Sequence, residues 1–331
     1  MTTPRKIRWL IAHQPQELFV RTARAFSQEL AQRCGDELEV EILTPPTYAE
    51  KYGEIPGIET LDYVDQDSLD KDGLSGFQTG IAAYWKSFTD GAFEMSQMQV
   101  ARIGQFYEDF KMFDLPYLFD DHDHVSRVVD GDIGRELCEQ LGKNTAVKGL
   151  AFTYSGGYRV IGSNNPIDSI EDLQGLKVVV ENRITLGMAM EDLGVKTLVL
   201  SPSLWKKHDP VGTGQADAME TTYLRFDGRC VFKTNHSMFM TTILVTNAFW
   251  ATLTEHQQQS FQEAARAAAA IERVWALEDA AEYEAKAKER GIRIVDISAE
   301  DAALLKRKSQ IVYVKTNGRF TKGLVHRVKT A

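Results

Sequence analysis

Polar side chains that could hold a small ligand follow several predicted strands at their carboxyl ends. Strands of an open parallel α/β sheet end along a common edge, and ligands bind outside that edge. We therefore predict that a ligand site includes His13, Gln97, Glu220, Thr221 and Tyr223. A lone histidine at such a position commonly has a structural role, and this alternative stays open for His13.

No local motif for catalysis accompanies these residues. The sequence contains no G-x-S-x-G nucleophile turn, no H-E-x-x-H zinc motif and no glycine-rich phosphate loop. An acid–base pair assembled from distant parts of the chain would leave no such trace. We therefore expect a protein that binds its ligand without turning it over and that has no cofactor.

Two short stretches suggest a metal site, and neither is complete. Ser68–Gly73 is similar to a D-x-D-x-D-G calcium loop, but serine takes the first ligand position and Thr79 the position of the bidentate glutamate. His122-Asp123-His124 is better explained as the first turn of a helix, where the helix dipole favours acidic residues. We expect no metal ion.

The composition narrows the class of partner. The 331 residues suffice for two ordinary α/β domains, and 43% apolar with 26% charged residues is typical of globular proteins. A net charge of −9 argues against a nucleic-acid partner, because phosphate binding requires clustered Lys and Arg. The three cysteines indicate neither a disulfide framework nor a zinc site: Cys34, Cys138 and Cys230.

The amino-terminal residues bear on export. Pro4-Arg5-Lys6 is similar to the start of a signal peptide, but the apolar run Ile7–Ala12 is shorter than a signal core of about 7–15 residues, and Arg8 interrupts it. No run approaches the roughly 20 apolar residues of a membrane span. We therefore identify no signal peptide in this chain, which leaves a cytoplasmic location open.

Hydrophobic periodicity predicts two α/β units and one long helix. The first unit starts with the strand Ile7–Ala12 and an amphipathic helix that ends near Cys34. A strand ending at Gly156-Gly157 leads into the second unit. From the capping box Thr254-x-x-Gln257 the pattern is helical to Gly291, which is about 36 residues or roughly 54 Å.

Four stretches in a fixed order resemble a known family. They are Gly156-Gly157-Tyr158-Arg159, then P-I-x-S-x-x-D-L-x-G-L-K from Pro166, then Leu193-Gly194, then G-T-G-x-x-D-x-x-E from Gly212. In combination they resemble the substrate-binding proteins of tripartite ATP-independent periplasmic (TRAP) transporters, of the dicarboxylate-binding type. The resemblance covers nearly the whole chain and weakens between Pro45 and Gly76.

The resemblance implies a two-lobed, hinged α/β fold of the periplasmic-binding-protein type with a long helix spanning both lobes. We expect one lobe to comprise residues 1–156 with 246–286, and the other residues 157–245 with 287–331. The ligand cleft would lie between the lobes, which would close on the ligand by hinge motion.

The resemblance also implies particular ligand contacts. In the family, an arginine on the strand after G-L-K-x grips the ligand carboxylate through two charge-assisted hydrogen bonds. Val179 occupies that position here. Arg159 matches the family's second arginine, so we expect it to contact an anion. Glu220 matches the family's glutamate, whereas Thr221 stands where asparagine is usual.

Other residues near the strand ends could compensate for Val179. Arg183 lies just beyond the strand and could supply a guanidinium, as could Arg225. Glu181 would instead favour a ligand that carries an amino group. Tyr223 could form part of an amphipathic wall.

The resemblance therefore implies a receptor that binds a small organic acid or zwitterion and delivers it to the membrane permease subunits of a TRAP transporter. We expect a periplasmic monomer. Two alternatives stay open: a ligand sensor of the same fold that works without a permease, and an enzyme on this fold.

Overall fold

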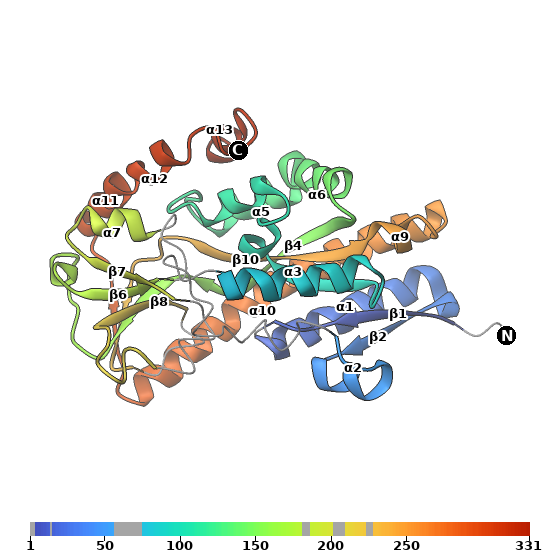
Figure 1. The fold of residues 1–331 in the computed structure, drawn as a ribbon, viewed down its shortest axis with the longest axis horizontal. Helices are drawn as coiled ribbons and strands as arrows, with labels where there is room; N and C mark the ends of the chain where they lie inside the picture. Colours follow the sequence, from blue (N-terminus) through green and yellow to red (C-terminus); the bar gives the residue numbers. More distant parts are fainter. Residues whose placement is uncertain (1–3, 14, 56–74, 181–185, 201–208, 223–227) are drawn as a thin grey trace.

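Two β-sheets organise the chain, with helices packed around them (Figure 1). The computed structural model describes residues 4–13, 15–55, 75–180, 186–200, 209–222 and 228–331. In order across the first sheet, sheet A, the strands are β2 (Leu38–Leu43), β1 (Arg5–Leu10), β3 (Met95–Gln99), β10 (Met238–Thr246) and β4 (Val147–Tyr158). In sheet B they are β11 (Arg293–Asp296), β9 (Cys230–Lys233), β5 (Val160–Ser163), β8 (Ala218–Thr221), β6 (Lys177–Val180) and β7 (Lys196–Val199).

The helices fall into three groups along the chain. Around sheet A they are α1 (Gln16–Cys34), α2 (Pro45–Tyr52), α3 (Ser75–Thr89), α4 (Val100–Ile103), α5 (His122–Asp130), α6 (Asp132–Asn144) and α9 (Asn247–Trp250). Beside sheet B lies α7 (Met188–Glu191), and α10 (Glu255–Glu289) runs past both sheets. The chain ends with α11 (Ala299–Lys308), α12 (Gln310–Lys315) and α13 (Leu324–Lys329).

The amino-terminal apolar run forms β1, an interior strand of sheet A. It pairs in parallel with β2 along its whole length and with β3 at its carboxyl end. Trp9 on β1 is fully buried and packs edge-on against Phe26 of α1, with ring centroids 5.2 Å apart. Phe26 in turn meets Phe261 of α10 at 5.4 Å. Residues 5–10 are thus part of the folded sheet, with Ile7, Trp9 and Leu10 in the core.

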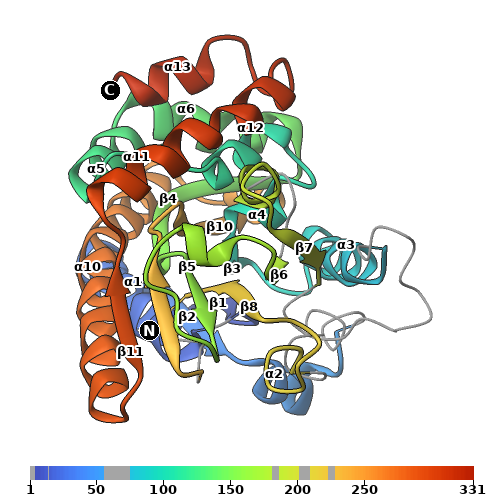
Figure 2. The same cartoon turned by 90° about the vertical axis from the view of Figure 1, so that its left-hand side faces the viewer.

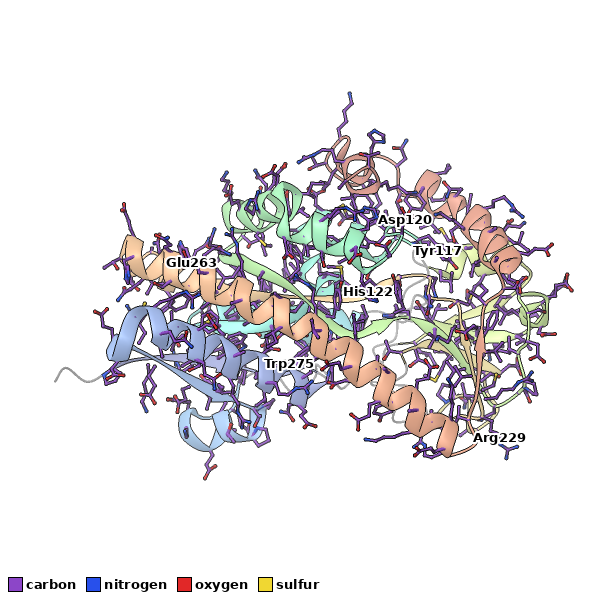
Figure 3. The ribbon with its side chains drawn as sticks, turned by 180° about the vertical axis from the view of Figure 1, so that it is seen from behind. Tyr117, Asp120, His122, Arg229, Glu263 and Trp275 are labelled. Atoms are coloured by element: carbon purple, nitrogen blue, oxygen red, sulfur yellow. The ribbon has the colours of Figure 1, made fainter. Side chains whose placement is uncertain are left out.

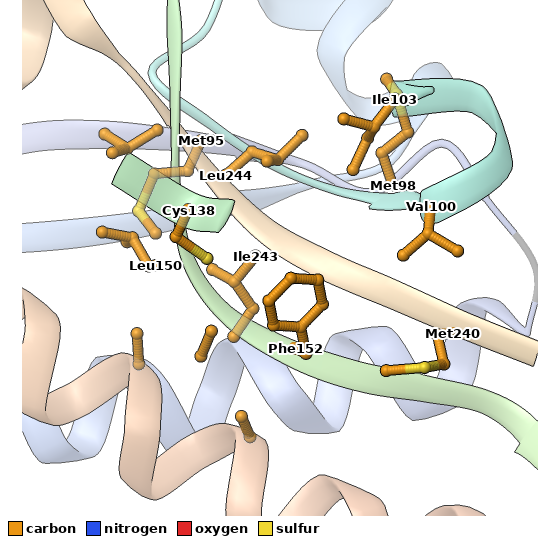
Figure 4. Packing of buried hydrophobic residues seen from close by; sticks show 14 of the residues in the cluster. Met95, Met98, Val100, Ile103, Cys138, Leu150, Phe152, Met240, Ile243 and Leu244 are labelled. Carbon is orange, nitrogen blue, oxygen red and sulfur yellow. The ribbon is translucent and has the colours of Figure 1, made fainter. Parts of the chain in front are cut away.

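Large apolar side chains fill much of the interior around sheet A. Figure 4 shows buried side chains of β3, β4 and β10, among them Met98, Phe152 and Ile243, which are at most 1% exposed. Phe152 stacks on Phe110 with centroids 5.7 Å apart. At about 25 cal/mol per Å² of buried apolar surface, these large side chains supply much of the stability of this sheet.

The chain crosses between the sheets at two adjacent places. β4 leads into β5 with only Arg159 between them, and β9 leads into β10 through residues 234–237. Gly156 and Gly157 have φ of 93° and 81°, a left-handed backbone that glycine adopts without strain. The backbone N–H of Arg159 donates to the carbonyl oxygen of Ser237 at 2.9 Å, which joins the two crossings.

The long helix α10 lies along the free edge of β4 and continues to sheet B (Figure 3). Its 35 residues span roughly 52 Å at 1.5 Å per residue. Gln262 Nε2 and Arg273 Nη1 donate to the carbonyl oxygens of Leu150 and Phe152 at 2.6 and 2.9 Å. These bonds satisfy backbone groups that an edge strand otherwise leaves unpaired. The predicted helix spanning both lobes is confirmed.

Two parts of the expected lobe division differ from the sheets observed. Residues 238–245, which we expected in the second lobe, form β10 between β3 and β4 of sheet A. Val312, Leu324 and Val328, also expected there, are buried in the core around sheet A. The reason is that β10 fills the gap between two strands that do not pair with each other, while α13 returns to α5, where His124 Nε2 lies 2.7 Å from the carbonyl oxygen of Val328.

Candidate ligand-binding site

A buried ion pair lies where the chain crosses between the sheets. Arg159 Nε donates to Glu220 Oε1 at 3.0 Å, and the two residues are 8% and 0% exposed. The antiparallel pairing of β5 with β8, in which Ile161 lies opposite Glu220, brings the two side chains together. The Arg159 guanidinium also stands 4.9 Å from the centroid of the Phe239 ring, an attractive cation–π distance.

His236 completes the environment of the carboxylate. Its Nε2 lies 2.9 Å from Glu220 Oε1, and its Nδ1 lies 2.8 Å from the hydroxyl of Thr234. An ionised carboxylate only accepts hydrogen bonds, so Nε2 carries the hydrogen and Nδ1 accepts from Thr234. Burial lowers the pKa of His236 although Glu220 opposes that shift. The imidazole is therefore neutral at pH 7.

Glu220 is ionised at neutral pH in spite of its burial. Burial alone raises the pKa of this carboxyl group, but Arg159 and His236 outweigh it and lower the pKa to about 2. The positive charge of Arg159 is thus partly balanced inside the protein. A ligand carboxylate that approached Arg159 would meet a guanidinium already shared with Glu220.

Three polar atoms beside this pair have no hydrogen-bond partner among the described residues. They are Glu220 Oε2, Thr222 Oγ1 and Ser237 Oγ, and all three are buried. A buried polar atom without a partner costs roughly 1–3 kcal/mol. This cluster therefore offers one acceptor and two hydroxyl groups to a ligand or to water.

Tyr117 holds the loop that carries His236. Its backbone N–H donates to the carbonyl oxygen of His236 at 2.6 Å, and its hydroxyl donates to that of Thr234 at 3.1 Å. Tyr117 has φ of 55°, which is uncommon for a residue other than glycine. Its segment precedes α5, so a part of the chain beside sheet A fixes one of the crossings.

Val179 and Thr221 lie apart from the ion pair. Val179 is fully buried and shares an apolar cluster with Val211 and Ala216. In the register of sheet B it lies beside Met219, and Glu220 therefore points to the opposite face. Thr221 is 3% exposed, and its hydroxyl donates to the neighbouring carbonyl oxygen of Thr222 at 3.3 Å. The structure does not bring Val179 to Arg159.

His13 and Gln97 lie at sheet A and have partners within the protein. Nδ1 of His13 accepts a hydrogen bond from Arg102 Nη1 at 3.0 Å, and the His13 ring packs edge-on against Tyr84. Gln97 Nε2 donates to the hydroxyls of Thr153 and Thr241 at 2.9 and 3.0 Å.

The Gln97 amide thus ties β3 to its neighbour β10 and to β4 beyond it. The two hydroxyl acceptors lie opposite each other where β10 pairs with β4.

Several sequence-predicted residues lie outside the part of the chain that the structure describes. These are Tyr223, Glu181, Arg183 and Arg225, together with the calcium-like stretch Ser68–Gly73. Sequence reasoning in turn missed His236 and Arg102. Neither belongs to a spaced pattern, and His236 acquires its role only because the crossing loop places it against Glu220.

The His122-Asp123-His124 stretch begins α5, as the helix-start explanation predicts. Asp121 Oδ1 accepts the backbone N–H of His124 at 2.7 Å and caps the helix, and His124 Nε2 lies 2.7 Å from the carbonyl oxygen of Val328. Among the described residues, no three His, Cys, Asp or Glu side chains gather as metal ligands would. None of the described helices has the length and apolar character needed to cross a bilayer.

Solved structures share the fold of this chain. A TRAP periplasmic solute-binding protein from Ochrobactrum anthropi matches 99% of this chain and 94% of its own, with a TM-score of 0.80 and 18% identity. One from Pseudomonas putida F1, with bound D-glucuronate, matches 99% of this chain and 97% of its own, with a TM-score of 0.75 and 20% identity. The fold is therefore that of a TRAP-type solute-binding protein.

Sequence comparison identifies the family. The model of the bacterial extracellular solute-binding proteins, family 7 (DctP), matches residues 82–225 and 228–318. The chain belongs to this family, and the predicted resemblance is confirmed. A solute-binding protein of Chromohalobacter salexigens is 23% identical over 230 residues, which cover 67% of each chain. The C4-dicarboxylate-binding periplasmic protein DctP of Rhodobacter capsulatus is 27% identical over 168 residues, covering 48% of this chain and 49% of its own.

Proposed function

We propose that this protein is the receptor of a TRAP transporter and binds a small hydroxylated monocarboxylic acid between the two sheets. The observation that carries the proposal is the buried Arg159–Glu220 pair with three unsatisfied polar atoms beside it. Arg159 would donate to the ligand carboxylate. Glu220 Oε2 would accept a hydrogen bond from a ligand hydroxyl or ammonium group, and Thr222 and Ser237 would bind further polar atoms.

Among the described residues Arg159 is the cation of this cluster, and one cation argues for one carboxylate rather than two. A second buried carboxylate would need a second cation. Hydrogen bonds from neutral donors offset only part of the free energy lost when a carboxylate is removed from water. Val179 supplies none and is covered by apolar neighbours. The Pseudomonas putida relative holds D-glucuronate, a molecule with one carboxylate and several hydroxyl groups, which supports this choice.

The remaining parts of the function are proposals of the same kind. His13, Gln97 and Thr221 would act mainly through the groups they position, while Tyr223, Glu181 and Arg183 are proposed as direct contacts. We propose that the protein works in the periplasm as the partner of a membrane permease, without turnover of the ligand. The relative of Rhodobacter capsulatus is named periplasmic, which supports this location.

A thermal-shift screen tests the proposal. Sugar acids, hydroxy acids, dicarboxylates, amino acids and neutral polyols are each added to the purified protein. A ligand at 100 times its Kd adds about 2.7 kcal/mol of stability, which is readily measured. We expect hydroxylated monocarboxylates to raise the melting temperature most.

Two variants make the test specific. Arg159→Lys retains the charge but loses the planar two-donor geometry, so ligand stabilisation should fall steeply. Arg24→Ala is the matched control, since Arg24 is exposed and forms no ion pair with any described residue. Stabilisation by dicarboxylates alone, or an unchanged shift in Arg159→Lys, would contradict the proposal.

A further inference from the structure

The carboxyl-terminal helices concentrate positive charge in a chain that is acidic elsewhere. Residues 302–331 contain eight Lys and Arg and no Asp or Glu, although the whole chain has a net charge of −9. Figure 2 shows α11, α12 and α13 following one another along one side of the molecule. Charge of one sign gathered on one side attracts partners of the opposite charge.

Five of these cations have a partner within the chain. Four form ion pairs, Lys306 with Asp120, Lys308 with Asp192, Arg319 with Glu108 and Arg327 with Glu136, and Lys329 stands over the Tyr313 ring. The other three are Arg307, Lys315 and Lys322. These three are exposed, and their side chains form no hydrogen bond or ion pair with any residue that the structure describes.

The exposed face of α11 and α12 presents two of these cations, Arg307 and Lys315, together with aliphatic side chains, and Lys322 follows in the segment before α13. Ser309 between the helices has φ −65° and ψ −14°, so the chain keeps a helical course from one to the next. Arg307, Ile311, Val314 and Lys315 recur three or four residues apart and share one face. Ile311 is 36% exposed and Val314 is 69% exposed. We refer to these four residues and Lys322 as the basic ridge.

We propose that the basic ridge docks on an anionic phospholipid surface. Lipid phosphates would pair with Arg307, Lys315 and Lys322, while Val314 and Ile311 would enter the interface between head groups and acyl chains. Cations that flank exposed aliphatic side chains on one helix face are typical of helices that lie on a membrane. Val314 is the most exposed large apolar side chain among the described residues, which favours lipid over a purely acidic protein surface.

Docking through the basic ridge would also orient the molecule. The rest of the chain carries more acidic than basic residues, so on balance an anionic surface repels it and attracts the basic ridge. The protein would then diffuse along the membrane in which a permease lies. The inference does not depend on which ligand is bound, and its test needs no ligand, so it can fail independently of the proposed receptor function.

Vesicle sedimentation tests the proposal with the full-length protein. We expect binding to vesicles of equal parts phosphatidylglycerol and phosphatidylcholine in 20 mM salt, and no binding to pure phosphatidylcholine. Raising the salt to 300 mM should release the protein, because exposed charges are then largely screened. Each basic residue near an anionic surface contributes about fivefold in affinity, so Arg307→Gln/Lys315→Gln/Lys322→Gln should weaken binding roughly 100-fold.

A charge-matched control separates the ridge from general charge. Lys6→Gln/Lys177→Gln/Lys196→Gln removes three exposed lysines elsewhere and should retain ridge-dependent binding within a fewfold. Val314→Ser should weaken binding with little change in its salt dependence. The proposal is overturned if the control triple weakens binding as much as the ridge triple, or if phosphatidylglycerol vesicles bind no better than neutral ones. In the latter case an acidic protein surface remains as the partner of these cations.

Discussion

Glu272 of the long helix accepts the backbone N–H of Tyr154 at 2.8 Å, through Oε2. Tyr154 lies on the free edge of β4, two residues before Gly156, where the chain turns toward the second sheet. Glu272 is fully buried, and its other oxygen has no partner among the described residues. Burial raises the pKa of Glu272 to about 8. The hydrogen bond from the Tyr154 N–H and the charge of Arg273 lower the pKa, but burial has the larger effect.

The raised pKa of Glu272 makes stability depend on pH. The carboxyl group is protonated in the folded protein at pH 7 and ionised in the unfolded chain, whose pKa is near 4.5. Its contribution is thus fully present below pH 4.5 and is lost as the pH rises through about 8. Glu272→Gln keeps the acceptor for Tyr154 without needing a proton, so it should stabilise the protein by about 1–3 kcal/mol at pH 8 and hardly at pH 5.

Urea unfolding at pH 5, 7 and 8 measures this difference directly. Glu278→Gln is the matched control, because Glu278 is exposed on the same helix and forms no ion pair with the described residues. A gain from Glu272→Gln that stays constant across this range would show that Glu272 does not titrate there.

The Arg159–Glu220 pair should be costly to break on one side only. Glu220→Gln removes the buried carboxylate that accepts from Arg159, and breaking a buried ion pair on one side typically costs about 3–5 kcal/mol. Replacing both residues together, as Arg159→Met/Glu220→Leu, removes the uncompensated charge and should recover much of that loss. Urea unfolding of the single variants Arg159→Met and Glu220→Leu and of the double variant gives the coupling energy, and additive losses would mean that the pair is not coupled.

The Arg159–Glu220 pair should also determine how the stability of the protein falls at acid pH. The pKa of Glu220 is lowered to about 2 in the folded state, so its contribution is fully present above about pH 4.5 and is lost as the pH falls toward 2. His236, whose pKa burial lowers, adds a loss that begins below its ordinary value of 6.5. His236→Gln should flatten the stability profile just below pH 6.5 and leave the loss below pH 4.5 in place, as unfolding at stepwise pH values would reveal.

Val179→Arg tests whether an arginine at the position expected from the family enables this protein to bind dicarboxylates. The side chain at position 179 is enclosed by Val211, Ala216 and their apolar neighbours. We expect the new charge to destabilise the protein by about 3 kcal/mol or more, without improved binding of dicarboxylates. Val179→Leu, which stays apolar, should cost less than about 3 kcal/mol. Tighter succinate binding in Val179→Arg, measured by calorimetry, would instead place this position in the ligand site.

Local sequence signals predicted individual helices and strands, but they did not predict the order in which the strands pair. The capping box Thr254–Gln257 and the alanine-rich stretch after it predicted α10 to within two residues, because both act within one helix. The insertion of β10 between β3 and β4 was not predicted, since antiparallel pairing to two strands far away in the sequence leaves no local periodicity.

The ligand site shows the same limit. Arg159 and Glu220 were found through their motifs, and the structure brings them together. Val179 was found in the same way, yet the alternation of strands β6 and β8 turns it to the other face. His236 carries no motif at all, and only the crossing loop between β9 and β10 gives it a role.

Gly157→Ala tests whether backbone freedom at the crossing between the sheets contributes to ligand binding. Gly157 has φ of 81°, and a Cβ there would meet only Ala280 at 3.9 Å, so the cost is backbone strain of about 1–2 kcal/mol rather than a clash. Gly318→Ala is the control: its φ is 83°, its surroundings are open, and it lies away from the crossings. Both variants should lose similar stability.

If the lobes close on their ligand through the crossing at Gly156-Gly157, only Gly157→Ala should also change ligand affinity, because it restricts the backbone that has to move. Equal ligand affinity in both variants, measured by calorimetry with the best ligand of the screen, would place the hinge elsewhere.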